Sequence, residues 1–180
     1  MPEHFFANLF AVMYIGMAPL TCMAAIISEE KEKNTLRVLQ MCNVKALEYL
    51  TGNAVYIMTM CMLGSLLIGF AGGYQETNLA AFLLIMLLGH GISTLLGAAI
   101  GVLSKNQMMA TSLTVPVMMI LSFLPMLSMF NETIAKVAKY VFSGQLYEML
   151  NHSGNISLEV ENILILGGNI LLVALVFLMA

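Results

Sequence analysis

The side chains best able to bind a partner or take part in chemistry lie in one charged segment, residues 29–53, between two apolar runs. Its charges first alternate in sign, and Leu36 and Leu39 are then spaced to share one face of a short helix capped by Asn34. Such a helix could present apolar anchors and acidic rim charges to a partner protein. It could also be a solvated helix at a membrane surface, which is the more common use of a charge run.

His90 is the one Asp, Glu, Lys, Arg or His residue inside the long apolar runs of the chain. An ionisable side chain within a membrane is a candidate for binding a substrate or moving a proton. A neutral imidazole that hydrogen-bonds to a neighbouring helix is the more ordinary use. We therefore expect a structural role for His90 and keep the transport role as the alternative.

Small residues recur at steps of four on the same apolar run, at Gly89, Ser93, Gly97 and Gly101. Such a face lets two helices approach closely in lipid, so we expect it to be a helix-packing surface. The pattern leaves open whether the facing helix belongs to the same chain or to a second subunit.

A cluster of sulfur-containing residues, Met58, Met60, Cys61 and Met62, could in principle bind a soft metal ion. No second cluster of such ligands is evident on a facing segment. We therefore expect these methionines to serve as adaptable packing, and we expect neither a metal nor a cofactor in this chain.

The composition sets the class of protein that must position these residues. Of the 180 residues, 60% are hydrophobic and only 9% are charged, against about 45–50% and about 25% in soluble domains. Most of the exterior must therefore face the lipid bilayer. The few basic side chains and the net charge of −3 also exclude a nucleic-acid-binding surface.

A helix needs about 20 apolar residues to cross the roughly 30 Å apolar core of a bilayer. Runs of that length predict an all-α membrane protein, a single transmembrane domain with five spans at residues 5–28, 49–73, 79–104, 108–130 and 163–180. The pattern also predicts a short cytoplasmic helix in the loop 29–48. Two short amphipathic helices are expected in the outer loop 131–162, where apolar residues recur at helical spacing.

The basic residues predict the orientation, because short loops rich in Lys and Arg stay on the cytoplasmic side. The first and third loops hold five such residues and the opposite loops two: Lys31, Lys33, Arg37, Lys45 and Lys105 against Lys136 and Lys139. We expect a multi-pass protein of the cell membrane with its N-terminus outside and its C-terminus in the cytoplasm. An outside start is unusual, and either a missing upstream span or translocation of a weakly charged N-terminal tail would explain it.

The loop 29–53 resembles the signature of type 2 ABC transporter permeases. In that family a Glu-Lys-Glu-x-Gly-Thr-Leu run leads into a short coupling helix, and a Glu-Tyr-x-x-Gly-Lys run follows it. The matching residues here are Glu30, Lys31, Glu32, Thr35, Leu36, Leu39, Glu48, Tyr49 and Gly52. The departures are Asn34 for glycine, Asn43 for proline and Asn53 for lysine. The first is mild, because Asn, like Gly, tolerates left-handed backbone, and further matches extend the resemblance over nearly the whole chain.

This resemblance implies a half-transporter of six spans that pairs with an identical or a different permease and binds an ABC ATPase in the cytoplasm. The five spans here would be the last five of the six. The coupling helix that docks on the ATPase would include Glu30, Glu32, Asn34, Thr35, Leu36 and Leu39. Because the sequence has no Gly-x-x-x-x-Gly-Lys-Ser/Thr phosphate loop, ATP would bind to the partner. The expected function is that of an exporter permease, not an enzyme, for a substrate that the sequence does not specify.

Two other classes of membrane protein fit the sequence less well. An intramembrane protease with a Glu-Glu-x-x-x-Arg motif is disfavoured, because Asn34 stands at the arginine position after Glu29 and Glu30 and no His pair follows to complete a metal site. A stand-alone secondary transporter would normally need intramembrane carboxylates for ion coupling. The predicted spans contain none.

Overall fold

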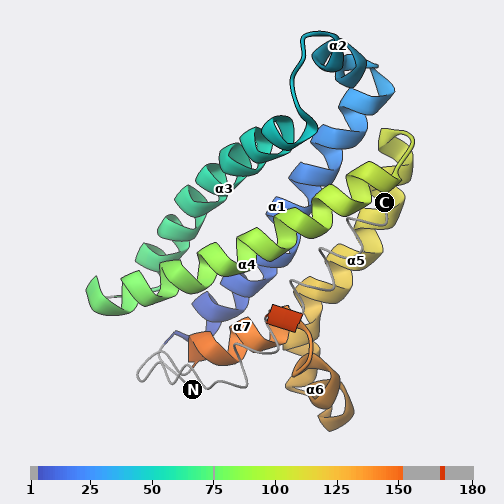
Figure 1. The fold of residues 1–180 in the computed structure, drawn as a ribbon. Coiled ribbons are helices and arrows are strands. Elements are labelled where there is room, and N and C mark those ends of the chain that lie inside the picture. The colour runs from blue at the N-terminus through green and yellow to red at the C-terminus, as the bar shows by residue number, and fades with distance from the viewer. Residues whose placement is uncertain (1–3, 75, 152–166, 169–180) are drawn as a thin grey trace.

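A computed structural model of the chain describes residues 4–74, 76–151 and 167–168, and this part of the chain is all-helical with short turns. Figure 1 shows the arrangement of its helices, α1 (Phe5–Glu32), α2 (Thr35–Met41), α3 (Ala46–Ala71), α4 (Glu76–Leu103), α5 (Gln107–Ser128), α6 (Glu132–Ala138) and α7 (Phe142–Asn151).

Four of these helices, α1, α3, α4 and α5, are long and apolar enough to cross a membrane. They coincide with the first four spans predicted from the sequence, as expected for a multi-pass membrane protein. The predicted fifth span, residues 163–180, falls outside the described residues apart from 167–168, so the total of five stays a prediction.

The central helix of the bundle is α1, which packs against α3, α4, α5 and α7. Figure 1 shows it crossing behind α4, with α3 and α5 on opposite sides. Its completely buried side chains form much of the main core, among them Ala11, Val12, Ile15 and Leu20. Pro19, at the middle of α1, is also buried. Because proline has no N–H, the carbonyl of Ile15 lacks its usual helical donor there.

The helix α1 continues beyond the apolar run that predicted it, through Glu29 to Glu32. Glu and Lys are good helix formers, so a change to charged residues does not by itself end a helix. With 28 residues, α1 is about 42 Å long at 1.5 Å per residue, which exceeds the roughly 30 Å core of a bilayer. The helix α1 is thus longer than the bilayer core, and its charged residues lie in its last turn.

The bundle has two ends, which we name after the short helices they hold. The α2 end contains α2 and the α4–α5 turn, residues 103–107, whereas the α7 end contains α6, α7 and the first residues of α1 (Figure 1). The two short helices expected in the loop 131–162 correspond in position to α6 and α7. The helix α7 is largely buried against α1, α4 and α5 instead of lying on the surface.

A buried polar network fixes the α7 end. Asn8 of α1 donates to the backbone oxygen of Leu150 at 3.2 Å and to the side-chain oxygen of Asn151 at 3.0 Å. The same Asn8 accepts a hydrogen bond from the hydroxyl of Tyr74, on which His4 stacks with ring centroids 4.3 Å apart. Buried polar groups are costly unless they are paired, and these contacts join the start of α1 to α7 and to the α3–α4 turn.

Candidate functional site

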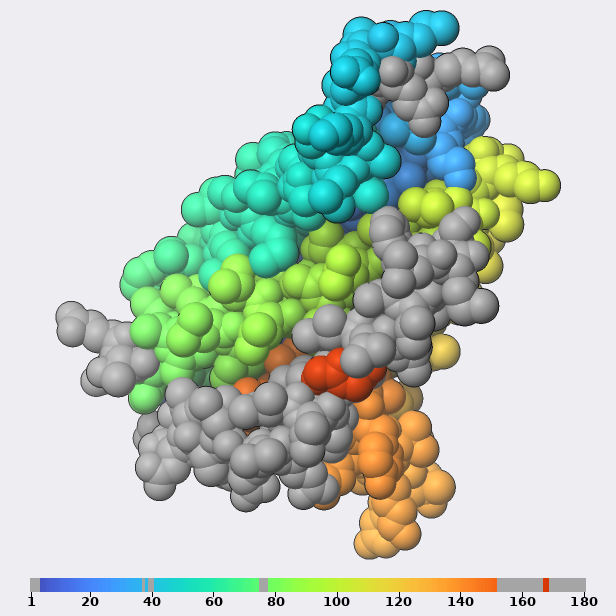
Figure 2. Space-filling model, viewed as in Figure 1, coloured from blue at the N-terminus to red at the C-terminus, as the bar shows by residue number. Residues whose placement is uncertain are grey.

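The helix α2 projects from its end of the bundle beyond α3 and α4 (Figure 2). Its exposed apolar side chains are Val38 and Met41, which have 58% and 81% of their surfaces accessible. Leu36 is half-buried and lines a cavity of about 210 Å³ between α1, α2, α3 and α4. The side chain of Leu39 lies outside the described part of the chain. The apolar surface that α2 leaves free thus includes Val38 and Met41, a pair at helical spacing that the sequence analysis did not single out.

Two asparagines with left-handed backbone bracket α2. Asn34 has φ 57° and Asn43 has φ 60°, a conformation that Asn adopts more readily than most residues with a side chain. The backbone N–H of Asn34 donates to the oxygen of Lys31 at 3.2 Å, which closes the last turn of α1. Asn34 therefore takes the role that glycine commonly has at the end of a helix. Thr35, which begins α2, is exposed.

The carboxylates at the end of α1 have different surroundings. Glu30 is half-buried and interacts electrostatically with the hydroxyl of Tyr49 near the start of α3. Glu29 pairs with Lys33 one turn further along the helix, at 2.5 Å, and this contact raises the pKa of the Lys33 ammonium group. Because the Glu29–Lys33 pair is exposed and local, it contributes little to stability.

Lys31 and Glu32 reach the α4–α5 turn. The Lys31 ammonium donates to the backbone oxygen of Val102 in α4 at 2.5 Å. The Glu32 carboxylate accepts a hydrogen bond from the backbone N–H of Gln107, the first residue of α5, at 2.9 Å. These contacts join residues 71 and 75 positions apart, so local periodicity could not reveal them. Glu32, expected from the sequence at the rim of a partner's binding surface, therefore also has a partner in its own chain.

The small-residue face of α4 packs against α1 of the same chain. Its members are all buried, namely Gly89, Ser93, Gly97 and Gly101. A side chain at Gly97 would overlap the backbone oxygen of Leu20, and one at Gly101 would lie 2.8 Å from the Cβ of Ile27. The close approach of α1 and α4 therefore requires small residues at these positions.

His90 is completely buried where α4 meets α3 and α1. Its Nε2 lies 2.7 Å from the hydroxyl oxygen of Ser65 in α3. Its ring also meets the Tyr14 ring of α1 edge-on, with centroids 5.5 Å apart. This is the geometry of a structural contact between helices, and a role of His90 in moving a substrate or a proton stays a prediction.

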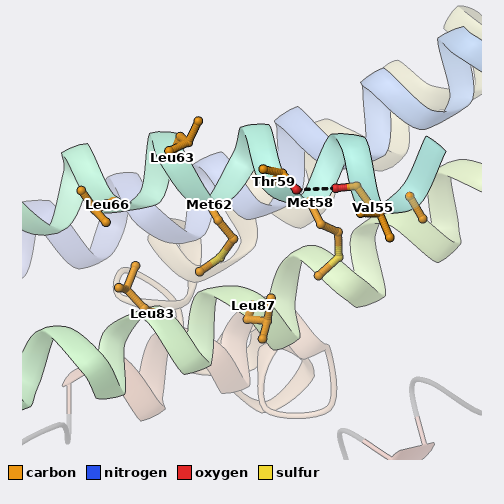
Figure 3. Close-up of a pocket in the computed structure, with 9 residues that line it drawn as sticks. Val55, Met58, Thr59, Met62, Leu63, Leu66, Leu83 and Leu87 are labelled. Carbon is orange, nitrogen blue, oxygen red and sulfur yellow. Dashed lines mark hydrogen bonds between the residues drawn. The ribbon is translucent and has the colours of Figure 1, made fainter. Parts of the chain in front are cut away.

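An apolar groove of about 470 Å³ runs between α3 and α4. Figure 3 shows Met58 and Met62 of α3 reaching toward α4, where Leu83 and Leu87 line the other side. Thr59 in this groove donates its hydroxyl to the backbone of its own helix at 2.7 Å. The methionine side chains of this groove therefore have mainly aliphatic neighbours. Within the described ranges, no group of three or more His, Cys, Asp or Glu residues is placed to hold a metal ion.

Comparison with known proteins finds a match to one protein family. Residues 3–180 match the sequence profile described as ABC-2 family transporter protein. No curated protein and no solved structure gives a significant match. The matched range includes the charged α1–α2–α3 segment and all four of the described helices that are able to cross a membrane.

Proposed function

Because the chain belongs to the ABC-2 transporter family, we propose that it is the permease of an ABC exporter driven by a separate ATPase. Family membership supports the role of a membrane transport subunit of an ABC transporter. The proposal adds that closure of the ATPase around ATP pushes on α2, and that the spanning helices respond by releasing substrate outward. In this scheme α2 is the coupling helix.

The exposed apolar pair on α2 is the observation that carries the proposal. Val38 and Met41 lie beyond the spanning helices on a projecting helix, where lipid does not cover them if α2 lies outside the membrane core. Burying such a side chain against a partner is worth about 1.5–3 kcal/mol. Leu36 and Leu39, the anchors expected from the sequence, remain the alternative contact pair.

In the proposed orientation the α2 end lies in the cytoplasm and the α7 end lies outside. The basic residues support it, because short loops rich in Lys and Arg are retained in the cytoplasm. The segments at the α2 end contain Lys31, Lys33, Arg37, Lys45 and Lys105, against Lys136 and Lys139 at the α7 end.

The proposed assembly contains a second permease, identical or different. The exposed side of α5 includes the hydroxyl residues Thr111 and Ser112 among apolar neighbours. Small hydroxyl residues are enriched where membrane helices pack together, so this side suits contact with another protein chain. The substrate class stays open among drugs, peptides, lipid-linked glycans and ions.

The test is to express the chain with the ABC ATPase that we expect in the neighbouring reading frame. We expect the two proteins to co-purify in detergent, and the ATPase activity of the complex to differ from that of the ATPase alone. A permease that inserts into membranes normally but neither binds the ATPase nor alters its activity would contradict the proposal.

A further inference from the structure

The last turn of α1 is joined to both sides of the α4–α5 turn, and we infer that Lys31 and Glu32 are positioning residues that make α2 move together with the ends of α4 and α5. This inference deepens the proposed function and rests on it for its consequence in transport. The linkage itself can be tested in the permease alone.

Lys31 acts at the end of α4. Its ammonium group donates to the oxygen of Val102 at 2.5 Å, in the last turn of α4, where backbone carbonyls lack a helical donor. A cation at this position also complements the partial negative charge at the end of a helix. Lys31 is half-buried, so water screens this contact less than it screens a pair on the open surface.

Glu32 acts at the start of α5. Its carboxylate accepts from the N–H of Gln107 at 2.9 Å, and the first N–H groups of a helix have no acceptor within the helix. The side chain of Asn106 accepts from the N–H of Met109 at 2.8 Å. The first turn of α5 is therefore capped once by its own preceding residue and once by α1. A negative charge at this position is favoured by the helix dipole.

The α4–α5 turn is itself firmly held, so that a displacement at either contact would reach the helices. Ser104 is completely buried, and its hydroxyl donates to the oxygen of Ile100 at 2.7 Å. This hydrogen bond and the cap formed by Asn106 restrict the conformation of the turn. The helix α2 begins at Thr35, directly after the turn that closes α1. A force on α2 would therefore act on α4 through Lys31 and on α5 through Glu32.

The signs of the two charges match their positions. The positive residue meets the negative end of α4, and the negative residue meets the positive end of α5. Exchanging them, as Lys31→Glu with Glu32→Lys, keeps the total charge of α1. Each new side chain would then face a helix end that has a partial charge of the same sign. The neighbouring pair Glu29 and Lys33 supplies the matched control, because it has the same two charges at the end of α1 and its partners lie four residues apart, away from the α4–α5 turn.

Hydrogen–deuterium exchange of the permease alone tests the linkage. In Lys31→Met and in Glu32→Ala, we expect amide exchange over residues 104–110 to rise about threefold to tenfold, because each variant loses one hydrogen bond that solvent partly screens. The charge-exchanged variant loses both contacts and should show a larger rise. Lys31→Arg and Glu32→Gln retain a donor and an acceptor, so they should stay near the wild type. Glu29→Ala and Lys33→Met should leave exchange in this range unchanged.

The consequence for coupling is tested in the complex with the ATPase. We expect Lys31→Met to leave the affinity for the ATPase and its KM for ATP within about twofold of the wild type, because the ammonium group of Lys31 contacts Val102 of α4 and α2 itself is unchanged. The effect of the permease on kcat should fall about threefold to tenfold, and Lys31→Arg should retain most of it.

The outcomes separate the linkage, its role in coupling and the proposed function. Equal exchange in Glu32→Ala and Glu29→Ala would overturn the linkage. Raised exchange together with a wild-type effect on kcat would overturn its role in coupling. If the wild-type permease does not bind the ATPase at all, the proposed function fails, and the exchange experiment still decides whether Lys31 and Glu32 hold the turn.

Discussion

His90 of α4 is the donor and Ser65 of α3 is the acceptor in the hydrogen bond that joins these two helices. The Ser65 hydroxyl has a single hydrogen, which it donates to the backbone oxygen of Cys61 at 2.9 Å. The Nε2 of His90, 2.7 Å from the same hydroxyl oxygen, must therefore bear the proton of this contact. This contact pairs one ring nitrogen of the buried His90 with a polar group of the neighbouring helix, as a buried polar atom requires.

Replacing Ser65 with Ala should destabilise the bundle, because it removes the acceptor for a buried N–H of His90. Hydrogen bonds between membrane helices average about 0.6 kcal/mol and reach about 1.7 kcal/mol, so we expect a loss of about 1 kcal/mol. Unfolding in mixed micelles of mild detergent and SDS measures it. Thr59→Val on the same helix is the control, since that exposed hydroxyl bonds only to its own helix. Equal stability of Ser65→Ala and the wild type would show that the contact contributes nothing.

Gly97 and Gly91 of α4 offer a paired test of the small-residue face. A Cβ at Gly97 would overlap the backbone oxygen of Leu20, whereas a Cβ at Gly91 would meet nothing within 4 Å. We expect Gly97→Ala to cost about 1–3 kcal/mol through overpacking. Gly91→Ala should be neutral or stabilise the helix by up to about 1 kcal/mol. Thermal unfolding in detergent separates the two, and a neutral result for Gly97→Ala would mean that α1 and α4 can move apart freely.

The double variant Val38→Ser with Met41→Ser should release the ATPase. Losing two apolar contacts of about 1.5 kcal/mol each weakens binding by about 100-fold. The stability of the spanning helices should not change, because both side chains are exposed. Quantitative co-purification gives the affinity, and unfolding in detergent gives the stability.

The comparison variant is Leu36→Ser with Leu39→Ser. If that pair abolishes binding while the Val38 and Met41 variant binds normally, the coupling surface is the leucine face expected from the sequence. Normal binding by both variants would remove α2 from the interface.

Cysteine labelling tests the orientation of the bundle. In a background with Cys22, Cys42 and Cys61 replaced by Ala, a membrane-impermeant maleimide added from outside should modify Glu132→Cys. It should miss Lys33→Cys until the membrane is opened, because the α2 end is proposed to be cytoplasmic. The opposite labelling pattern would invert the topology and place α2 out of reach of any ATPase.

The apolar runs predicted the first four spans well, because lipid requires long stretches without charge. They predicted the helix ends less well. The apolar run of the first span stops at Ser28, yet α1 continues to Glu32, since hydropathy marks the edge of the lipid and not the end of the helix. The burial of α7 was also missed, because an amphipathic pattern shows that one face is apolar but not which protein surface covers it.

The family resemblance found in residues 29–53 is confirmed, and the sequence correctly indicated that Asn34 could take left-handed backbone. The sequence could not show which apolar side of α2 faces the rest of the bundle. A short helix with Leu36 on one side and Val38 on another has no single apolar face. The contact of Glu32 with Gln107 was equally out of reach, because it depends on how the bundle brings two distant segments together.

Pro19 lies at the middle of α1, where the helix lacks one of its backbone hydrogen bonds. The two halves of α1 are anchored differently, to α7 through Asn8 at one end and to the α4–α5 turn through Glu32 at the other. If α1 turned by about 10° around Pro19, each end of this helix of about 42 Å would swing by about 4 Å in opposite directions. Helix shifts of about 1–2 Å already suffice to switch subunit interfaces. A displacement of α2 would then displace α7 at the opposite end of the bundle, because α1 packs against both of these helices.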